Sequence, residues 1–74
     1  MSEYWTEEMK NGVKVDILVT HIRDENEKLE GLDCLFHIGS VLTEAQTFMG
    51  REGECMKKLT NYIEGLHDAY GVTH

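Results

Sequence analysis

The stretch VKVDILVT, residues 13–20, fits two kinds of secondary structure, and the predicted fold class depends on which of them it forms. Its alternation of apolar and polar residues and its β-branched side chains are typical of a half-buried strand. The preceding Asn11-Gly12 favours a type I′ hairpin turn, which would pair residues 4–9 with residues 13–18. The same stretch also begins a helical stripe that continues to Gly31 and consists of Val15, Leu18, Val19, Ile22 and Leu29. We expect a helix here and keep the hairpin as the alternative.

Two more segments of helical length follow, and each ends near a glycine. The apolar side chains of residues 34–49 fall in one arc of a helical wheel, and Asp33 precedes them as an N-cap. Residues 54–70 divide cleanly into an apolar and a polar sector. A turn between the two segments is favoured over one long helix, because Gly50 and Gly53 would each cost a helix about 1 kcal/mol relative to alanine.

The sequence therefore predicts an all-α fold, a small three-helix bundle in a single domain over residues 1–74, with a helical hairpin at residues 34–70. The alternative is an α+β fold, in which an N-terminal β-hairpin at residues 4–22 packs on that helical hairpin.

Charge and size restrict the classes of partner. The 74 residues include 14 acids and 7 bases, a net charge of -7, which argues against direct binding of nucleic acid or of an anionic membrane. No apolar run reaches the length of a membrane span. The two cysteines are too few for a disulfide framework, so we expect reduced thiols and a cytoplasmic protein. A core this small gains stability from association, and a homodimer is expected.

The sequence contains no pattern that predicts an enzyme. It lacks a phosphate-binding glycine loop and a nucleophile elbow. Cys34, His37 and Cys55 are potential metal ligands, but both cysteines fall in the apolar sectors, so buried structural thiols are the better interpretation. We expect no catalytic residue, no metal and no cofactor.

Two surfaces are predicted to bind a partner. The outer face of the second expected helix carries almost no charge, and Gly39, Thr43 and Thr47 recur every four residues beside Phe36 and Ser40. The first expected helix displays Asp24, Glu25, Glu27 and Glu30, which could meet a basic protein surface.

These features predict a small acidic interaction protein that binds and regulates or inhibits another protein with a basic surface. A phage or mobile-element inhibitor of a nucleic-acid-binding or defence protein is the sharpest form of this hypothesis. The alternative is a protein that sequesters a small molecule or nucleotide at an oligomer interface lined by Ser40, Thr43, Thr47, Gln46 and His37.

Overall fold

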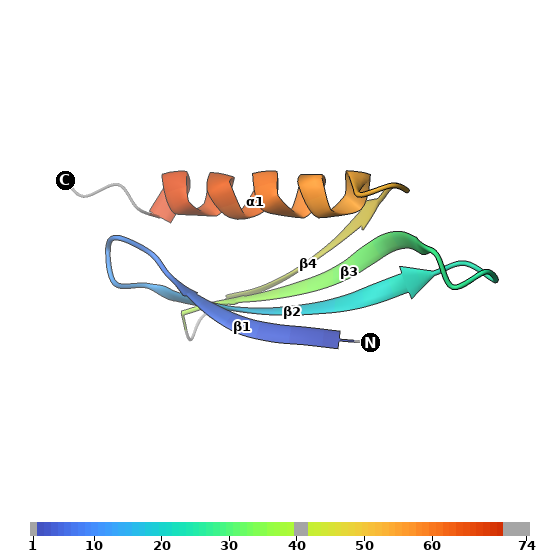
Figure 1. Ribbon diagram of the computed structural model, residues 1–74. Coiled ribbons are helices and arrows are strands. Elements are labelled where there is room, and N and C mark those ends of the chain that lie inside the picture. The colour runs from blue at the N-terminus through green and yellow to red at the C-terminus, as the bar shows by residue number, and fades with distance from the viewer. Residues whose placement is uncertain (1, 40–41, 71–74) are drawn as a thin grey trace.

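The chain forms a four-stranded antiparallel sheet and one helix. The computed structural model describes residues 2–39 and 42–70. The elements are β1 (Ser2–Glu8), β2 (Lys14–Arg23), β3 (Leu29–Ile38), β4 (Leu42–Met49) and α1 (Glu54–Tyr70). The strands follow one another in the order β1-β2-β3-β4, and α1 lies along one face of the sheet (Figure 1). The sheet therefore has one covered face and one open face.

The predicted all-α three-helix bundle is wrong. Only residues 54–70 form the expected helix, as α1. Residues 34–49 supply the end of β3 and all of β4, so the helical hairpin at residues 34–70 is not formed either. The alternative α+β fold shares that error, although its N-terminal hairpin corresponds to β1 and β2. Burial explains the outcome, because a helix over residues 34–49 would turn Phe36 to water, whereas β3 buries this side chain completely.

The core lies between the sheet and α1. Alternate residues of β2 and β3 point toward the helix, as the period of two requires. The buried side chains are Met9, Val15, Ile17, Val19, Leu32, Cys34, Phe36, Ile38, Cys55, Leu59 and Leu66. The Tyr62 ring extends the core to β4, with its centroid 4.7 Å from that of Phe36 and 5.6 Å from that of Phe48. Within residues 2–39 and 42–70, no helix has the length and apolar character of a membrane span.

The β1–β2 hairpin closes with a three-residue loop and not with a type I′ turn. The Gly12 amide donates to the Met9 carbonyl (2.9 Å), and the Met9 amide donates to the Val13 carbonyl (2.8 Å). Gly12 closes the loop at φ +87°, in the left-handed region. Asn11-Gly12 thus occupies the last two positions of the turn, where a type I′ turn would need this dipeptide at the centre.

The β2–β3 hairpin repeats this loop without a glycine. The Glu27 amide donates to the Asp24 carbonyl (2.9 Å), and the Asp24 amide donates to the Lys28 carbonyl (3.0 Å). Glu27 takes the closing position at φ +61°, which a residue with a Cβ adopts at some cost in energy. The Arg23 guanidinium donates to the Glu27 carbonyl (3.0 Å) and helps to hold this conformation.

Candidate functional site

An apolar row crosses the open face of the sheet. Tyr4, Leu18, Leu35 and Ala45 are paired in register across the four strands. Their neighbours along each strand point to the covered face, so these four side chains point away from α1. Tyr4 is 65% exposed and Leu35 is 45% exposed. An aromatic ring and a leucine so open to water, with Leu18 between them in one row, are typical of a contact surface.

Hydroxyl and carboxyl groups flank this apolar row on both sides. The Thr6 hydroxyl donates to Asp16 Oδ1 (2.7 Å) on one side, and the Thr47 hydroxyl donates to Asp33 Oδ1 (2.8 Å) on the other. His37 Nδ1 lies 3.0 Å from the Thr43 hydroxyl oxygen. These hydrogen bonds fix the direction of the side chains at the rim of the row.

The open face is acidic. The side-chain alternation directs Glu8, Asp16 and Asp33 to this face. Among the paired positions of β1–β4, Lys14 is the one lysine or arginine that points to the same face. Asp16 and Asp33 lie on opposite sides of the apolar row. The combination of apolar centre and acidic rim matches a partner surface with an apolar centre and basic groups around it.

A shallow hollow opens in the same face. Its volume is about 180 Å³, and its lining includes Leu18, Thr20, Asp33, Leu35, Ala45 and Thr47. Pockets for drug-sized ligands usually enclose about 300–1,000 Å³. The hollow can therefore accept one or two side chains of a partner more readily than a nucleotide.

The two cysteines lie on the covered face, away from this surface. Both are free thiols and both are buried. Burial, with added repulsion from the Asp33 carboxylate and from Cys55, raises the pKa of the Cys34 thiol from 9.0 to about 11. A neutral buried thiol is a poor nucleophile and a poor metal ligand. The cysteines therefore act as apolar core residues.

The three potential metal ligands do not all face one site. Cys34 points to α1, whereas His37, three residues further along β3, points to the open face. Within the described ranges, no three His, Cys, Asp or Glu side chains are arranged to hold a metal ion. Another histidine, His67 of α1, instead contacts Glu7 of β1, with 3.0 Å between Nε2 and Oε1, and links the helix to the edge of the sheet.

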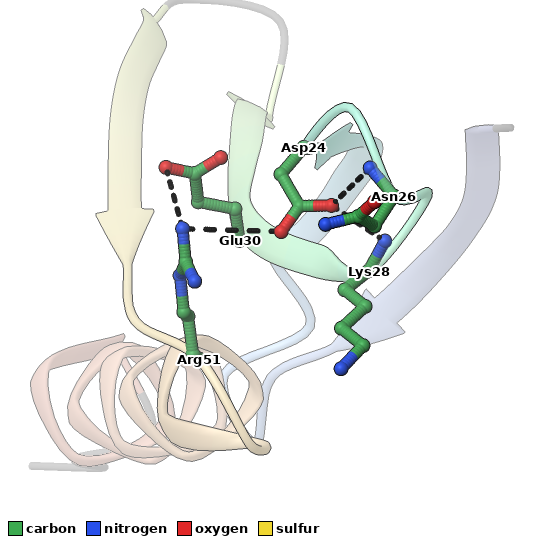
Figure 2. A network of polar contacts seen from close by, with 5 residues as sticks. All are labelled: Asp24, Asn26, Lys28, Glu30 and Arg51. Carbon is green, nitrogen blue, oxygen red and sulfur yellow. Dashed lines mark hydrogen bonds and ion pairs between the residues drawn. The ribbon is translucent and has the colours of Figure 1, made fainter.

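A polar network closes the end of the molecule where β3 begins (Figure 2). Asp24 Oδ1 accepts hydrogen bonds from the backbone amides of Asn26 (2.8 Å) and Lys28 (3.0 Å). Its other oxygen lies 3.8 Å from Arg51 Nη2, which also lies 3.9 Å from Glu30 Oε1. Arg51 thus ties the β2–β3 turn to the segment that leads into α1, a structural role.

A second hollow lies beside this network. It encloses about 360 Å³ and is lined by Lys28, Leu29, Arg51, Glu52 and Gly53. An anion would have to displace Asp24 and Glu30 from the Arg51 guanidinium, and it would enter an acidic protein. This hollow is therefore a weaker candidate than the open face.

The residues predicted to bind a partner are divided among three places. Thr43 and Thr47 lie exposed on β4 and point to the open face. Phe36 is buried under α1 and cannot anchor a partner. Gly39 follows β3 with φ +60°, and Ser40 lies outside the described residues.

The four predicted acids gather around the β2–β3 turn. Glu25 and Glu27 are exposed, while Asp24 and Glu30 are partly buried beside Arg51. The turn lies at one end of the sheet and not at the centre of the open face (Figure 1). It is therefore separate from the apolar row.

The sequence patterns do not predict the apolar row itself. A helix over residues 34–49 places Leu35 in its apolar sector, and the three-helix bundle gives Tyr4 no defined position. The alternation of Asp33, Leu35 and His37 with Cys34, Phe36 and Ile38 is the signal that would have separated the two faces.

The chain has the architecture of a small antiparallel protein in which four strands are followed by one helix. In comparisons with known proteins, no family model, no curated protein and no solved structure matches the chain. The function must therefore be argued from the surface.

Proposed function

We propose that this chain is a small protein-binding module that uses the open face of its sheet to bind, and so regulate or inhibit, a partner protein with a basic surface. The observation that carries the proposal is the apolar row of Tyr4, Leu18, Leu35 and Ala45, which α1 leaves uncovered. We also propose that the protein acts in the cytoplasm, where its two free thiols would stay reduced.

Charge supports a basic partner. Asp16 and Asp33 stand beside the apolar row, and the whole chain carries a net charge of -7. A field of this sign speeds the encounter with a cationic surface, and the apolar contacts then slow dissociation. Binding should weaken with salt but persist in part at high salt, because only the electrostatic contribution is screened.

The alternative of a sequestered small molecule has less support. The hollow beside the apolar row holds about 180 Å³, below the usual range for nucleotide-sized ligands. Thr43, Thr47 and His37 do share the open face, but they hydrogen-bond to protein groups already.

The test compares two variants that each replace a partly exposed apolar side chain with aspartate. Leu35→Asp places a charge in the apolar row, and Met56→Asp places one on the exposed outer side of α1, where Met56 is 42% exposed, against 45% for Leu35. The immobilised wild type and both variants are incubated with extract of the source cells at low and at high salt. Every retained protein is identified, purified and titrated against each variant.

The expected result is one basic protein that binds the wild type and Met56→Asp with equal affinity and binds Leu35→Asp at least about tenfold more weakly. Circular dichroism must show that both variants are folded. Equal binding of all three proteins, or a partner lost only with Met56→Asp, would refute the open face as the site.

A further inference from the structure

The two edges of the sheet differ in how well they are protected from pairing with another strand. β1 and β4 each pair with one neighbour among the described residues. β1 carries three acids, Glu3, Glu7 and Glu8, so two β1 edges would repel one another. β4 carries one acid, Glu44, and has no lysine, no proline and no bulge. An eight-residue edge without these devices is a template for another strand.

Hydrogen bonding identifies the groups that β4 leaves free. The Gly50 amide donates to the Glu30 carbonyl (2.9 Å), so the even-numbered residues at this end of the ladder direct their backbone groups to β3. The odd-numbered residues Thr43, Ala45 and Thr47 therefore direct theirs outward. The outward carbonyl of Met49 is already taken, because Lys58 Nζ donates to it (2.7 Å). Lys58 thus limits the available edge to the segment 42–48.

One antiparallel register fits this segment to a second copy of itself. With Ala45 opposite Ala45 of the second copy, Thr43 lies opposite Thr47, and all three outward residues form ladder hydrogen bonds. Small side chains then meet on the open face.

On the covered face, this register opposes Leu42, which is 44% exposed, to Phe48 of the second copy, an apolar cross-strand pair. It also opposes Glu44 to Gln46, so that the two Glu44 carboxylates do not face each other. The effect of the Glu44 charge is also reduced, because the Tyr62 hydroxyl donates a hydrogen bond to the Glu44 carboxylate (2.5 Å).

The position of α1 is compatible with this pairing. α1 packs on β3 and β4, so across a β4–β4 contact the two helix axes would lie about 10 Å apart, given strand spacings of about 4.8 Å. Gly65 lies two turns beyond Lys58 on the same side of α1, toward the β4 edge. A Cβ at Gly65 would meet nothing in the monomer, so the monomer does not require this helix-weakening glycine. A second helix that approaches this side of α1 closely would require it.

We infer that two copies of this chain pair through the free edge of β4 to form a continuous eight-stranded sheet with both helices on one face. The open faces then join into one surface with the apolar row repeated across it. This interface goes beyond the proposed function and does not depend on it. It uses a strand edge in place of the helical face that the sequence predicted for partner binding.

The test measures the mass of the purified protein in solution and needs no partner. Sedimentation equilibrium of the wild type should give about 17 kDa at high concentration, twice the 8.5 kDa of one chain. Ala45→Pro removes an outward amide and no bond to β3, so the variant should fold but dissociate at least about tenfold more readily, because two symmetric hydrogen bonds are lost. Thr6→Pro is the matched control, because the Thr6 amide points outward from β1, and this variant should remain dimeric.

A second measurement covers the case in which proline disturbs folding. The double variant Thr43→Lys with Thr47→Lys sets like charges opposite one another across the interface and should also be monomeric. In the wild type, amide exchange at Thr43, Ala45 and Thr47 should slow as the protein concentration rises, while exchange at Tyr4 and Thr6 should not change. A wild type that stays at 8.5 kDa, or a dimer that survives both β4 variants, overturns the inference. A dimer broken by Leu35→Asp but not by the β4 variants would assign the contact to the open face and would overturn it equally.

Discussion

The two faces of the sheet are built from the same four strands, yet one is covered by α1 and the other is exposed to water. On the covered face, Ile17 and Phe36 are completely buried beneath α1. On the open face, their chain neighbours Leu18 and Leu35 are of similar apolar character but remain partly or largely exposed. The apolar character of a side chain therefore does not decide its burial here; the face on which α1 packs decides it.

This difference separates residues that hold the fold from residues that are free to serve binding. A side chain on the covered face can be judged by the free energy of unfolding. A side chain on the open face should affect that quantity little and should affect association instead. Adjacent residues on one strand allow the distinction to be tested pair by pair.

The largest contrast is expected between Phe36→Ala and Leu35→Ala. Loss of the buried Phe36 ring, which also contacts Tyr62, should lower the free energy of unfolding by about 3–5 kcal/mol. Loss of the exposed Leu35 side chain should lower it by less than about 1 kcal/mol. Urea unfolding followed by circular dichroism measures both. Similar losses of unfolding free energy for the two variants would mean that Leu35 is buried in the folded protein.

The second contrast depends on pH and concerns Cys34. Because the pKa of this thiol is raised from 9.0 to about 11 in the folded protein, the unfolded chain releases the proton at lower pH than the folded chain does. The stability that the neutral thiol contributes is fully present below pH 9 and is lost as the pH rises from 9 toward 11.

Urea unfolding between pH 8 and pH 11 should therefore show a steeper decline for the wild type than for Cys34→Ala. This comparison removes the contribution of all other ionisable groups, which are the same in both proteins. Parallel curves would show that Cys34 is not shielded from water as the covered face requires.

A smaller effect is expected at the margin of the covered face, where Tyr62 reaches β4. Tyr62→Phe keeps the ring contacts with Phe36 and Phe48 but removes the hydrogen bond to Glu44. The free energy of unfolding should fall by about 0.5–1.5 kcal/mol. The double variant Tyr62→Phe with Glu44→Gln should lose little more than Tyr62→Phe alone, and fully additive losses would argue against the contact.

The smallest effect is expected on the open face, at Thr47. Thr47→Val removes the hydroxyl that donates to Asp33 but keeps the β-branched shape that suits a strand. The free energy of unfolding should change by less than about 0.5 kcal/mol, because both groups are exposed. Partner binding should weaken, since Asp33 loses the bond that orients it. A loss of stability above that of Tyr62→Phe would contradict the division between the faces.

The sequence was sufficient for α1 and insufficient for the sheet, and the reason is physical. In residues 54–70 the apolar side chains recur only with the period of a helix. In residues 34–49 the open face also carries apolar side chains, Leu35 and Ala45, which fill the polar half of the strand alternation. The feature that makes the open face a candidate binding surface therefore also hid the strands.

The candidate site was predictable only in part. Thr43 and Thr47 were selected because they recur every four residues, and they do share a face, because residues four apart also share a face on a strand. Phe36 was selected by the same helical argument and falls on the wrong side, because its position among the even-numbered residues of β3 directs it to α1. Tyr4 joins the site through the pairing of β1 with β2, which the alternative β-hairpin at residues 4–22 contained and the preferred helical bundle did not.

The consecutive order of the strands has a consequence for how the chain reaches its native state. Every strand pairs with the strand next to it in the chain, so the sheet consists of contacts with short sequence separation, and such topologies fold quickly for β proteins. During synthesis, however, β2 and β3 leave the ribosome before α1 exists to cover them. For that interval Ile17, Phe36 and Leu32 are exposed on a nascent sheet, so the chain should be most prone to aggregation before residues 54–70 emerge.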